Sequence, residues 1–366
     1  MVSTVETPRL EGDYLAQRRQ RNLWRLGGLG LLALGAMLAG CAFGAVSISP
    51  YDWLRLLSQQ FSPVEPPPAD LLTKEMVLWN LRLPRVVCAL LVGGGLSLAG
   101  AAMQGLFRNP LADPALIGVS SGAALGAALG ILLAGTLSGI LLVQGIGSSL
   151  VIMTFSFVGG LIAVTIVQAI GRHGARTSVA TMLLAGIAIN ALCSALTGFI
   201  LFLADDNQLR DITFWMLGSL GASNWTWAAG MAVAVGLSLV WLCRQAGVFN
   251  AFLLGEAEAG HLGYEVESFK RKTVMLTALI VGLAVSFTGV IGFVGLVVPH
   301  LIRLAYGSDH RLLLPASALL GGTILVLADT ICRNLGPAEL PIGIVTAVLG
   351  APFFLYLMRR QRWLSA

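Results

Sequence analysis

The chain has 366 residues, of which 56% are hydrophobic and only 11% are charged. Average globular proteins carry about 25% charged residues, so this composition excludes a water-soluble fold. The formal net charge is +5, but the basic residues are scattered over many loops and form no single stripe, so nucleic acid is not an expected partner.

Ten apolar segments are long enough to cross a lipid bilayer, which needs roughly 20 apolar residues per helix. They cover residues 23–47, 84–107, 114–134, 148–170, 179–203, 225–243, 273–290, 291–306, 312–331 and 341–358. Only Gly289, Gly292 and Gly295 separate the seventh segment from the eighth. The sequence therefore predicts an all-α membrane protein with about ten transmembrane helices.

All ten segments belong to one predicted domain, 23–360, between a polar N-terminal arm, 1–22, and a short tail, 361–366. The first segment is too long for the h-region of a signal peptide, so we expect it to remain as a span. With ten spans, 17 of the 23 lysine and arginine residues fall on the side of the N-terminus. The positive-inside rule therefore predicts that both termini are cytoplasmic.

The second and seventh segments are similar when the chain is shifted by 189 residues. Seven of 22 aligned positions are identical, with Ala89, Leu90, Val92, Gly93, Ser97, Gly100 and Pro110 matching Ala278, Leu279, Val281, Gly282, Ser286, Gly289 and Pro299. Segments five spans apart cross the membrane in opposite directions, which is typical of an inverted repeat with the substrate route between its halves. A shared bias toward glycine and leucine is the alternative explanation.

The spans contain glycine stripes but almost no ionisable groups. In the third segment a glycine recurs every four residues, at Gly118, Gly122, Gly126 and Gly130. This spacing lets a neighbouring backbone approach closely, so we interpret it as packing. Asp329 is the ionisable exception, and it precedes Arg333 by four residues, which predicts a local ion pair.

The sequence contains no recognisable nucleotide-binding or catalytic motif. None of the three lysines lies in a G-x-x-x-x-G-K-[ST] context, and there is no G-x-S-x-G elbow or H-E-x-x-H pair. We therefore expect neither an enzyme nor a chain with its own metal or cofactor. Any ATP-driven step would need a separate ATPase.

The inner loop at 251–272 is a candidate docking element. Ala251 to Gly263 has the pattern of a short helix interrupted by glycines, followed by residues of mixed charge. Leu253, Leu254 and Leu262 would be exposed without a partner, which favours contact with another cytosolic protein over a merely solvated loop.

On the outer side, Arg82 and Arg85 lie in LRLPR at the start of the second span. Snorkelling to lipid phosphates is one interpretation, and docking of carboxylates from an acidic partner is the other, since exposed guanidinium groups pair with carboxylates in bidentate fashion. The outer stretch Asp205 to Leu220 predicts a short interfacial or re-entrant helix, with Asp205 and Asp206 as N-cap candidates.

Seven ordered motifs resemble FecCD-type permeases, the membrane subunits of the ATP-binding-cassette importers that take up iron siderophores, haem and cobalamin in bacteria. They are LRLPR (81–85), GAAMQGLFRNPLADPALIGVSSGA (100–123), LLAGIAIN (183–190), LGEAEAGHLG (254–263), GFVGLVVPHLIRL (292–304), VLADTICR (326–333) and ELPIGIVTAVLGAPFF (339–354). The resemblance covers about residues 75–360. It implies the type II ABC importer permease fold, in the bacterial inner membrane.

The resemblance also implies partners and residue roles. The chain would form a homodimer, with two cytosolic ATPase subunits that bind ATP and Mg below it and a periplasmic substrate-binding protein above it. Arg82, Arg85 and Arg333 would receive acidic residues of the binding protein. The ATPase would be engaged by Gly255, Glu256, Ala259, Leu262 and Gly263. The cytoplasmic gate would include Asn109, Leu111, Thr177 and Ser178.

The expected cargo is haem, because residues 183–193 and 205–221 are most similar to those of haem permeases. An iron siderophore or cobalamin is the alternative within the family, since apolar path walls suit all three cargoes. An ion-coupled secondary transporter is the alternative of another class, but such carriers usually need buried carboxylates or histidines in their spans. A non-transporting membrane scaffold is the third alternative, but an inverted repeat would then have no function.

Overall fold

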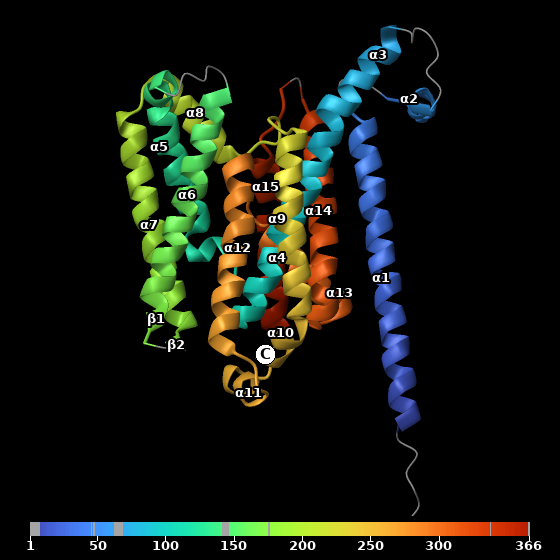
Figure 1. Cartoon of the computed structure of the whole chain (residues 1–366), viewed down its shortest axis with the longest axis vertical. Helices are drawn as coiled ribbons and strands as arrows, with labels where there is room; N and C mark the ends of the chain where they lie inside the picture. Colours follow the sequence, from blue (N-terminus) through green and yellow to red (C-terminus); the bar gives the residue numbers. More distant parts are fainter. Residues whose placement is uncertain are drawn as a thin grey trace, which may run out of the picture.

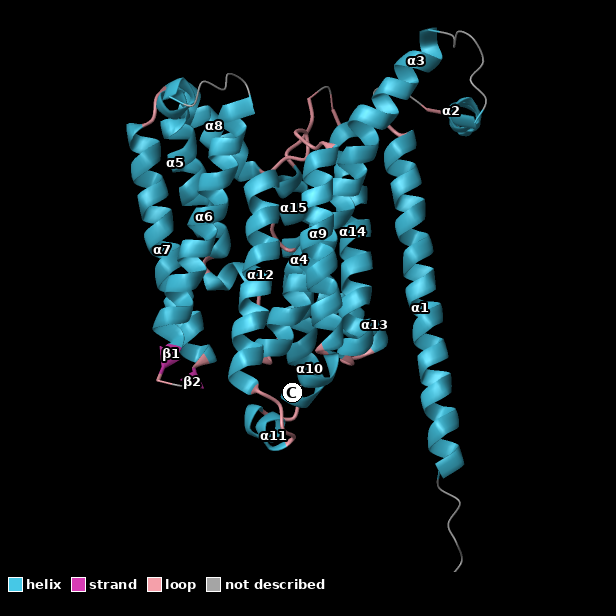
Figure 2. Ribbon diagram, in the orientation of Figure 1, coloured by secondary structure: helices cyan, strands magenta, loops and turns pink. Residues whose placement is uncertain are grey.

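The computed structural model describes residues 8–44, 46, 48–61, 69–140, 146–174, 176–336 and 338–364. This part of the chain is almost entirely helical (Figure 1, Figure 2). Its first half contains α1 (Pro8–Ala42), α2 (Pro50–Phe61), α3 (Ala69–Met76), the π-helix η1 (Val77–Arg82), α4 (Leu83–Phe107), the 3-10 helix η2 (Pro114–Ile117), α5 (Val119–Ile140), α6 (Ile146–Gly171), β1 (Arg172–His173), β2 (Arg176–Thr177), α7 (Val179–Leu203) and α8 (Asp206–Leu217).

The second half contains α9 (Trp225–Arg244), α10 (Ala246–Phe252), α11 (Glu256–His261), α12 (Val266–Thr288), α13 (Val294–Tyr306), α14 (His310–Asn334) and α15 (Ile342–Leu364). The strands β1 and β2 form a small antiparallel pair, with Arg172 opposite Thr177. They join α6 to α7 at one end of the bundle.

Seven of the ten predicted spans are confirmed in the described residues, and the other three coincide with shorter apolar helices. Seven helices are long and apolar enough to cross a membrane, and three shorter apolar helices cover Val119–Ala134, Val294–Tyr306 and Ile342–Tyr356. Each falls on one predicted segment. The predicted break near Gly289 is also confirmed, because α12 ends at Thr288 and α13 begins at Val294.

Two helices extend beyond the predicted segments because polar residues continue the helix outside the apolar run. The first helix begins at Pro8, so the helix passes through the boundary placed at residue 22. The seventh span begins at Val266 and includes the charged residues Glu267 and Lys270 in its first turns.

The core is centred on α4, which is buried along nearly its whole length and packs against α9, α12, α13 and α14. The closest approach is at Gly100, where an added Cβ would lie 1.8 Å from the backbone oxygen of Gly295. Only a glycine allows α4 and α13 to come this close.

The glycine stripe of the third span is a packing surface, as predicted. An added Cβ at Gly126 would lie 2.1 Å from the Phe155 oxygen of α6, and one at Gly122 would lie 2.6 Å from the Gly159 oxygen. Gly118 has a different role, because it caps η2 with φ 84° and lies just before α5. The stripe therefore holds α5 and α6 together through direct backbone contact.

The helices α4 and α12 run antiparallel, as an inverted repeat requires. Gly95 lies against Ile280, whereas Phe107, at the other end of α4, lies near Lys270 at the start of α12. The aligned positions are helical in both copies as far as Ser97 and Ser286. Beyond them the copies differ, since Gly100 is inside α4 while its match Gly289 ends α12 with φ 71°.

The two ends of the bundle carry different elements (Figure 1). The end that holds α8, α2 and α3 is called the outer end below, and the end that holds α10, α11 and the β1–β2 pair is called the inner end. The described ends of α1 and α15, at Pro8 and Leu364, both lie toward the inner end. Both described chain ends are therefore on the same side of the bundle.

The predicted short outer helix is also confirmed as α8. Asp205 is its N-cap, accepting hydrogen bonds from the backbone N of Asn207 and Gln208, and the Gln208 side chain completes a capping box. Asp206, the second candidate, is the first residue of the helix instead.

Candidate functional site

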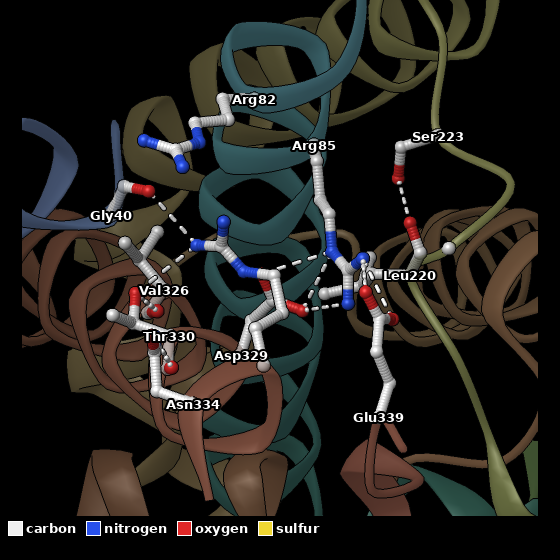
Figure 3. Close-up of polar contacts among 12 residues, drawn as sticks. Gly40, Arg82, Arg85, Leu220, Ser223, Val326, Asp329, Thr330, Asn334 and Glu339 are labelled. Carbon is white, nitrogen blue, oxygen red and sulfur yellow. Dashed lines mark hydrogen bonds and ion pairs between the residues drawn. The ribbon is translucent and has the colours of Figure 1, made fainter. Parts of the chain in front are cut away.

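At the outer end, five charged side chains from three helices and one loop lie close together in what we call the outer arginine cluster (Figure 3). It consists of Arg82, Arg85, Asp329, Arg333 and Glu339. Arg82 ends η1 and Arg85 lies in the first turn of α4, so the LRLPR motif spans the junction of these two helices. Pro84 is tolerated there because the first backbone N–H groups of a helix have no intrahelical acceptor.

Asp329 is the centre of the cluster. Its carboxylate is 1% exposed, and it accepts hydrogen bonds from Arg85 Nε at 3.0 Å and Arg85 Nη2 at 2.9 Å. Arg333 Nε lies 3.0 Å from Asp329 Oδ2. The predicted local pair of Asp329 and Arg333 is therefore confirmed, but the carboxylate is shared with Arg85, 244 positions away in the sequence.

Glu339 is a member of the cluster that the sequence did not indicate. It lies in the loop between α14 and α15, and both of its carboxylate oxygens accept from Arg85 Nη1, at 3.0 and 2.9 Å. Its side chain is 54% exposed. Figure 3 shows Arg85 between the buried Asp329 and this exposed carboxylate.

Arg82 does not point to solvent. It is 5% exposed, and its Nη1 donates to the backbone oxygens of Cys41 at 2.7 Å and Ala42 at 3.1 Å, while Nη2 donates to the Val46 oxygen. The last carbonyls of α1 lack intrahelical partners and lie at the negative end of the helix dipole, so a buried cation is stabilised there. Arg82 thus fastens the outer end of α1 to the bundle.

The sequence interpretation took the outer guanidinium groups to be exposed, and this premise is wrong. Arg82 is buried, and the side chains of Arg85 and Arg333 are only 13% and 8% exposed. Arg333 Nη2 also donates to the Gly40 oxygen of α1 at 2.9 Å. Acceptors within the chain already bind all three groups, and only the Glu339 side of Arg85 opens to solvent.

At the inner end, the docking segment predicted at 251–272 forms α10, α11 and the start of α12. Gly255, with φ 146°, precedes α11, and Gly263, with φ 86°, follows it, so these glycines provide the predicted helix breaks. Ala259 is fully buried and supports α11 from the protein side. Leu253, Leu254 and Leu262 are 45%, 70% and 61% exposed, as expected for an apolar surface without its partner.

The predicted gate residues lie on two separate inner segments. In the turn after α4, Asn109 Oδ1 accepts from the backbone N of Leu111 at 2.9 Å. Ser178 is the N-cap of α7, with its Oγ 3.3 Å from Thr181 N, and Thr177 directly precedes it. No hydrogen bond links the two pairs within the described part of the chain.

Thr177 instead borders a cavity of about 340 Å³ at the inner end, lined by apolar as well as charged residues. The cavity lies between α4, α6, α7 and α12, and its lining includes Phe107, Gln168, Thr177 and Lys270. Among the described residues, no group of three or more His, Cys, Asp or Glu side chains could hold a metal ion.

A bundle of seven helices long enough to cross a membrane and three shorter apolar helices, with exposed leucines at one end and a charged cluster at the other, is consistent with a transport permease. The comparisons with known proteins agree. Residues 31–360 match the FecCD transport family, and the chain belongs to that family.

Two curated relatives are transport permeases. The chain is 45% identical over 287 residues to the hemin transport system permease protein HmuU of Yersinia pestis, covering 78% of this chain and 84% of that protein. It is 38% identical over 349 residues to the vitamin B12 import system permease protein BtuC of Salmonella paratyphi A, covering 95% and 98%.

A solved structure agrees as well. It is an ABC transporter in an inward-facing conformation, described as of metal-chelate type, and it matches with a TM-score of 0.78 at 32% identity, covering 92% of this chain and 98% of that one. This chain is therefore a multi-pass permease subunit of an ABC importer of the FecCD family, and the family's subunits are not catalytic.

Proposed function

We propose that this permease carries haem from the periplasm to the cytoplasm by alternating access. The observation that carries the proposal is the 45% identity to a hemin permease across 78% of the chain. The protein works as a homodimer in the bacterial inner membrane, with both termini cytoplasmic, two ATPase subunits at the inner end and a periplasmic binding protein at the outer end. ATP and Mg are bound by the ATPase subunits, and this chain binds no cofactor.

Transport is driven by differential binding of two states of the permease. ATP in the partner subunits and the loaded binding protein each favour one state, and only this difference in affinity can shift the equilibrium. The exposed leucines around α11 provide an apolar surface for the ATPase. In this proposal Gly255, Glu256, Leu262 and Gly263 engage the ATPase, with Ala259 beneath them.

The outer arginine cluster is the proposed docking site for the binding protein. With three guanidinium groups and two carboxylates, the cluster has one net positive charge, complementary to an acidic partner. Arg85 is the residue through which docking occurs, because its Glu339 side is the open one. Arg82 and Arg333 lie deeper in the protein and contribute positive electrostatic potential to this docking site.

The proposed cytoplasmic gate comprises Asn109 and Leu111 on one segment and Thr177 and Ser178 on the other. The first segment follows α4 and the second precedes α7, both at the inner end. A tilt of α4 or of α7 therefore moves the attached segment. Closure of the gate would then take place between the two copies of the permease.

Cobalamin is the second candidate cargo, because the vitamin B12 permease matches 95% of the chain. Reconstitution of the permease with its ATPase and binding protein in liposomes, offered haem, cobalamin or a ferric siderophore, decides between them. We expect the complete complex to take up haem, and we expect this uptake to require ATP bound by the ATPase subunits. Uptake of cobalamin without haem would overturn the cargo, and uptake driven by a proton or sodium gradient without ATPase would overturn the importer mechanism.

A further inference from the structure

Lys270, in the first turns of α12, joins three separate segments at the inner end. The residue is 2% exposed. Its ammonium donates to the Glu256 carboxylate at the start of α11 and to the Thr177 backbone oxygen at 2.8 Å, and it lies 2.8 Å from Glu267 Oε1. A lysine ammonium has three N–H donors, and three acceptors surround this one, which is what a buried charge requires.

Thr177 is held by α12 at both of its backbone polar groups. Its N–H donates to Glu267 Oε2 at 2.9 Å, and its C=O accepts from Lys270 Nζ at 2.8 Å. Glu267 and Lys270 also pair with each other, so the two bonds close a small network. Because Thr177 and Ser178 lead directly into α7, this network fastens the start of α7 to the start of α12.

The same ammonium reaches the exposed helix α11. Glu256 is the first residue of α11, and its side chain is 44% exposed, on the element whose neighbouring leucines face solvent. A displacement of α11 therefore moves the Glu256 carboxylate, which is bonded to Lys270. Lys270 is in turn bonded to Thr177, the residue before the α7 N-cap Ser178. The ammonium is shielded from water, so salt screens these contacts less than it screens a surface ion pair.

We propose that Lys270 is a positioning residue that transmits movement of α11 to the start of α7 and so to the cytoplasmic gate. The inference rests on the proposed function, which assigns α11 to the ATPase and Thr177 to the gate. Lys270 lies within the 251–272 segment, but it is buried and is not among the residues assigned to ATPase contact or to the gate. Its neighbour Lys272 is exposed and provides a matched control on the same helix.

The test uses the complete complex of permease and ATPase in liposomes. The native cysteines are replaced by alanine, and a nitroxide is attached at Ala180→Cys, an exposed position in the first turn of α7. Pulsed electron paramagnetic resonance measures the distance between the labels of the two permease copies with and without ATP, and the ATPase rate is measured on the same samples. No cargo is needed.

In the unsubstituted background we expect ATP to change the label distance. Lys270→Met should lose most of this change while the ATPase rate stays within about twofold, Lys270→Arg should restore it, and Lys272→Met should behave as the background.

A full ATP-dependent distance change in Lys270→Met would overturn the inference. So would a parallel loss of the change and of the ATPase rate in Lys270→Met, because that result indicates weaker docking of the ATPase. If the background protein shows no ATP-dependent change, the proposed alternating access itself fails, and the two failures are thus distinguished. Failure of haem uptake alone would contradict only the proposed identity of the cargo.

Discussion

The two ends of the permease use buried charge in opposite ways. In the outer arginine cluster the buried member is an anion, Asp329, shared by two guanidinium groups of the bundle. At the inner end the buried member is a cation, Lys270, shared by Glu256 and Glu267, whose side chains are 44% and 36% exposed. The outer group thus ties rigid helices together, whereas the inner group connects the bundle to an exposed element. We expect the first to determine stability and the second to determine coupling.

The largest effect is expected from Asp329→Asn, which leaves Arg333 without its carboxylate partner and Arg85 with only the exposed Glu339. Breaking a buried ion pair by removing one partner costs about 3–5 kcal/mol of the free energy of unfolding. Thermal unfolding of the purified permease in detergent measures this loss. A variant as stable as the unsubstituted protein would show that the outer cluster is not structural.

A smaller loss of stability is expected from Arg82→Met. The carbonyls of Cys41 and Val46 would lose the Arg82 donor, whereas the Ala42 carbonyl would keep the Ile48 N–H, and a buried polar group left unsatisfied costs about 1–3 kcal/mol. Because Arg82 binds the last turn of α1 and the residues just after it, limited proteolysis should release α1 sooner in this variant. Equal proteolysis would mean that the other contacts of α1, including the Arg333 bond to the Gly40 oxygen, are enough to hold it.

These two substitutions also show where sequence reasoning fails. The spans could be predicted because hydropathy and length act within one segment, and the Asp329–Arg333 pair could be predicted because a helix places residues i and i+4 together. The contact of Arg85 with Asp329 depends on how α4 packs against α14, which no local pattern encodes. Arg82 was misinterpreted because its acceptors are backbone carbonyls, which every residue has.

The inner end shows the same division. The glycine breaks and exposed leucines of 251–272 could be predicted, because they are properties of one short stretch. Lys270 could be counted only as one more inner positive charge, since its link to Thr177 spans 93 positions. Its spacing of three residues from Glu267 was the available signal, and it indicates a helical pair without indicating burial.

A third prediction concerns binding and leaves stability unchanged. Leu254→Ser and Leu262→Ser remove apolar side chains that are already exposed, so unfolding should not change. Each should weaken association with the ATPase by roughly tenfold, since burying a leucine contributes about 1.5–3 kcal/mol. Affinity measured by titration of the ATPase checks this, with Leu209→Ser, an exposed leucine of α8 at the outer end, as the control. Equal affinity in all variants would place the ATPase elsewhere.

The smallest effect is expected from Glu339→Gln, and it separates the two functions that the outer cluster could have. The exposed pair with Arg85 contributes less than about 1 kcal/mol to stability, so the variant should unfold like the unsubstituted protein, unlike Asp329→Asn. Loss of this carboxylate raises the cluster from one positive charge to two and frees Arg85 Nη1. An acidic binding protein should then associate a few-fold faster at low ionic strength, with the gain shrinking at high salt because exposed charges are screened. Surface plasmon resonance at two salt concentrations measures both rates.

Slower association would mean that Glu339 orients Arg85 for docking and does not compete with the partner. An unchanged association rate at both salt concentrations would mean that Arg85 is not part of the docking surface.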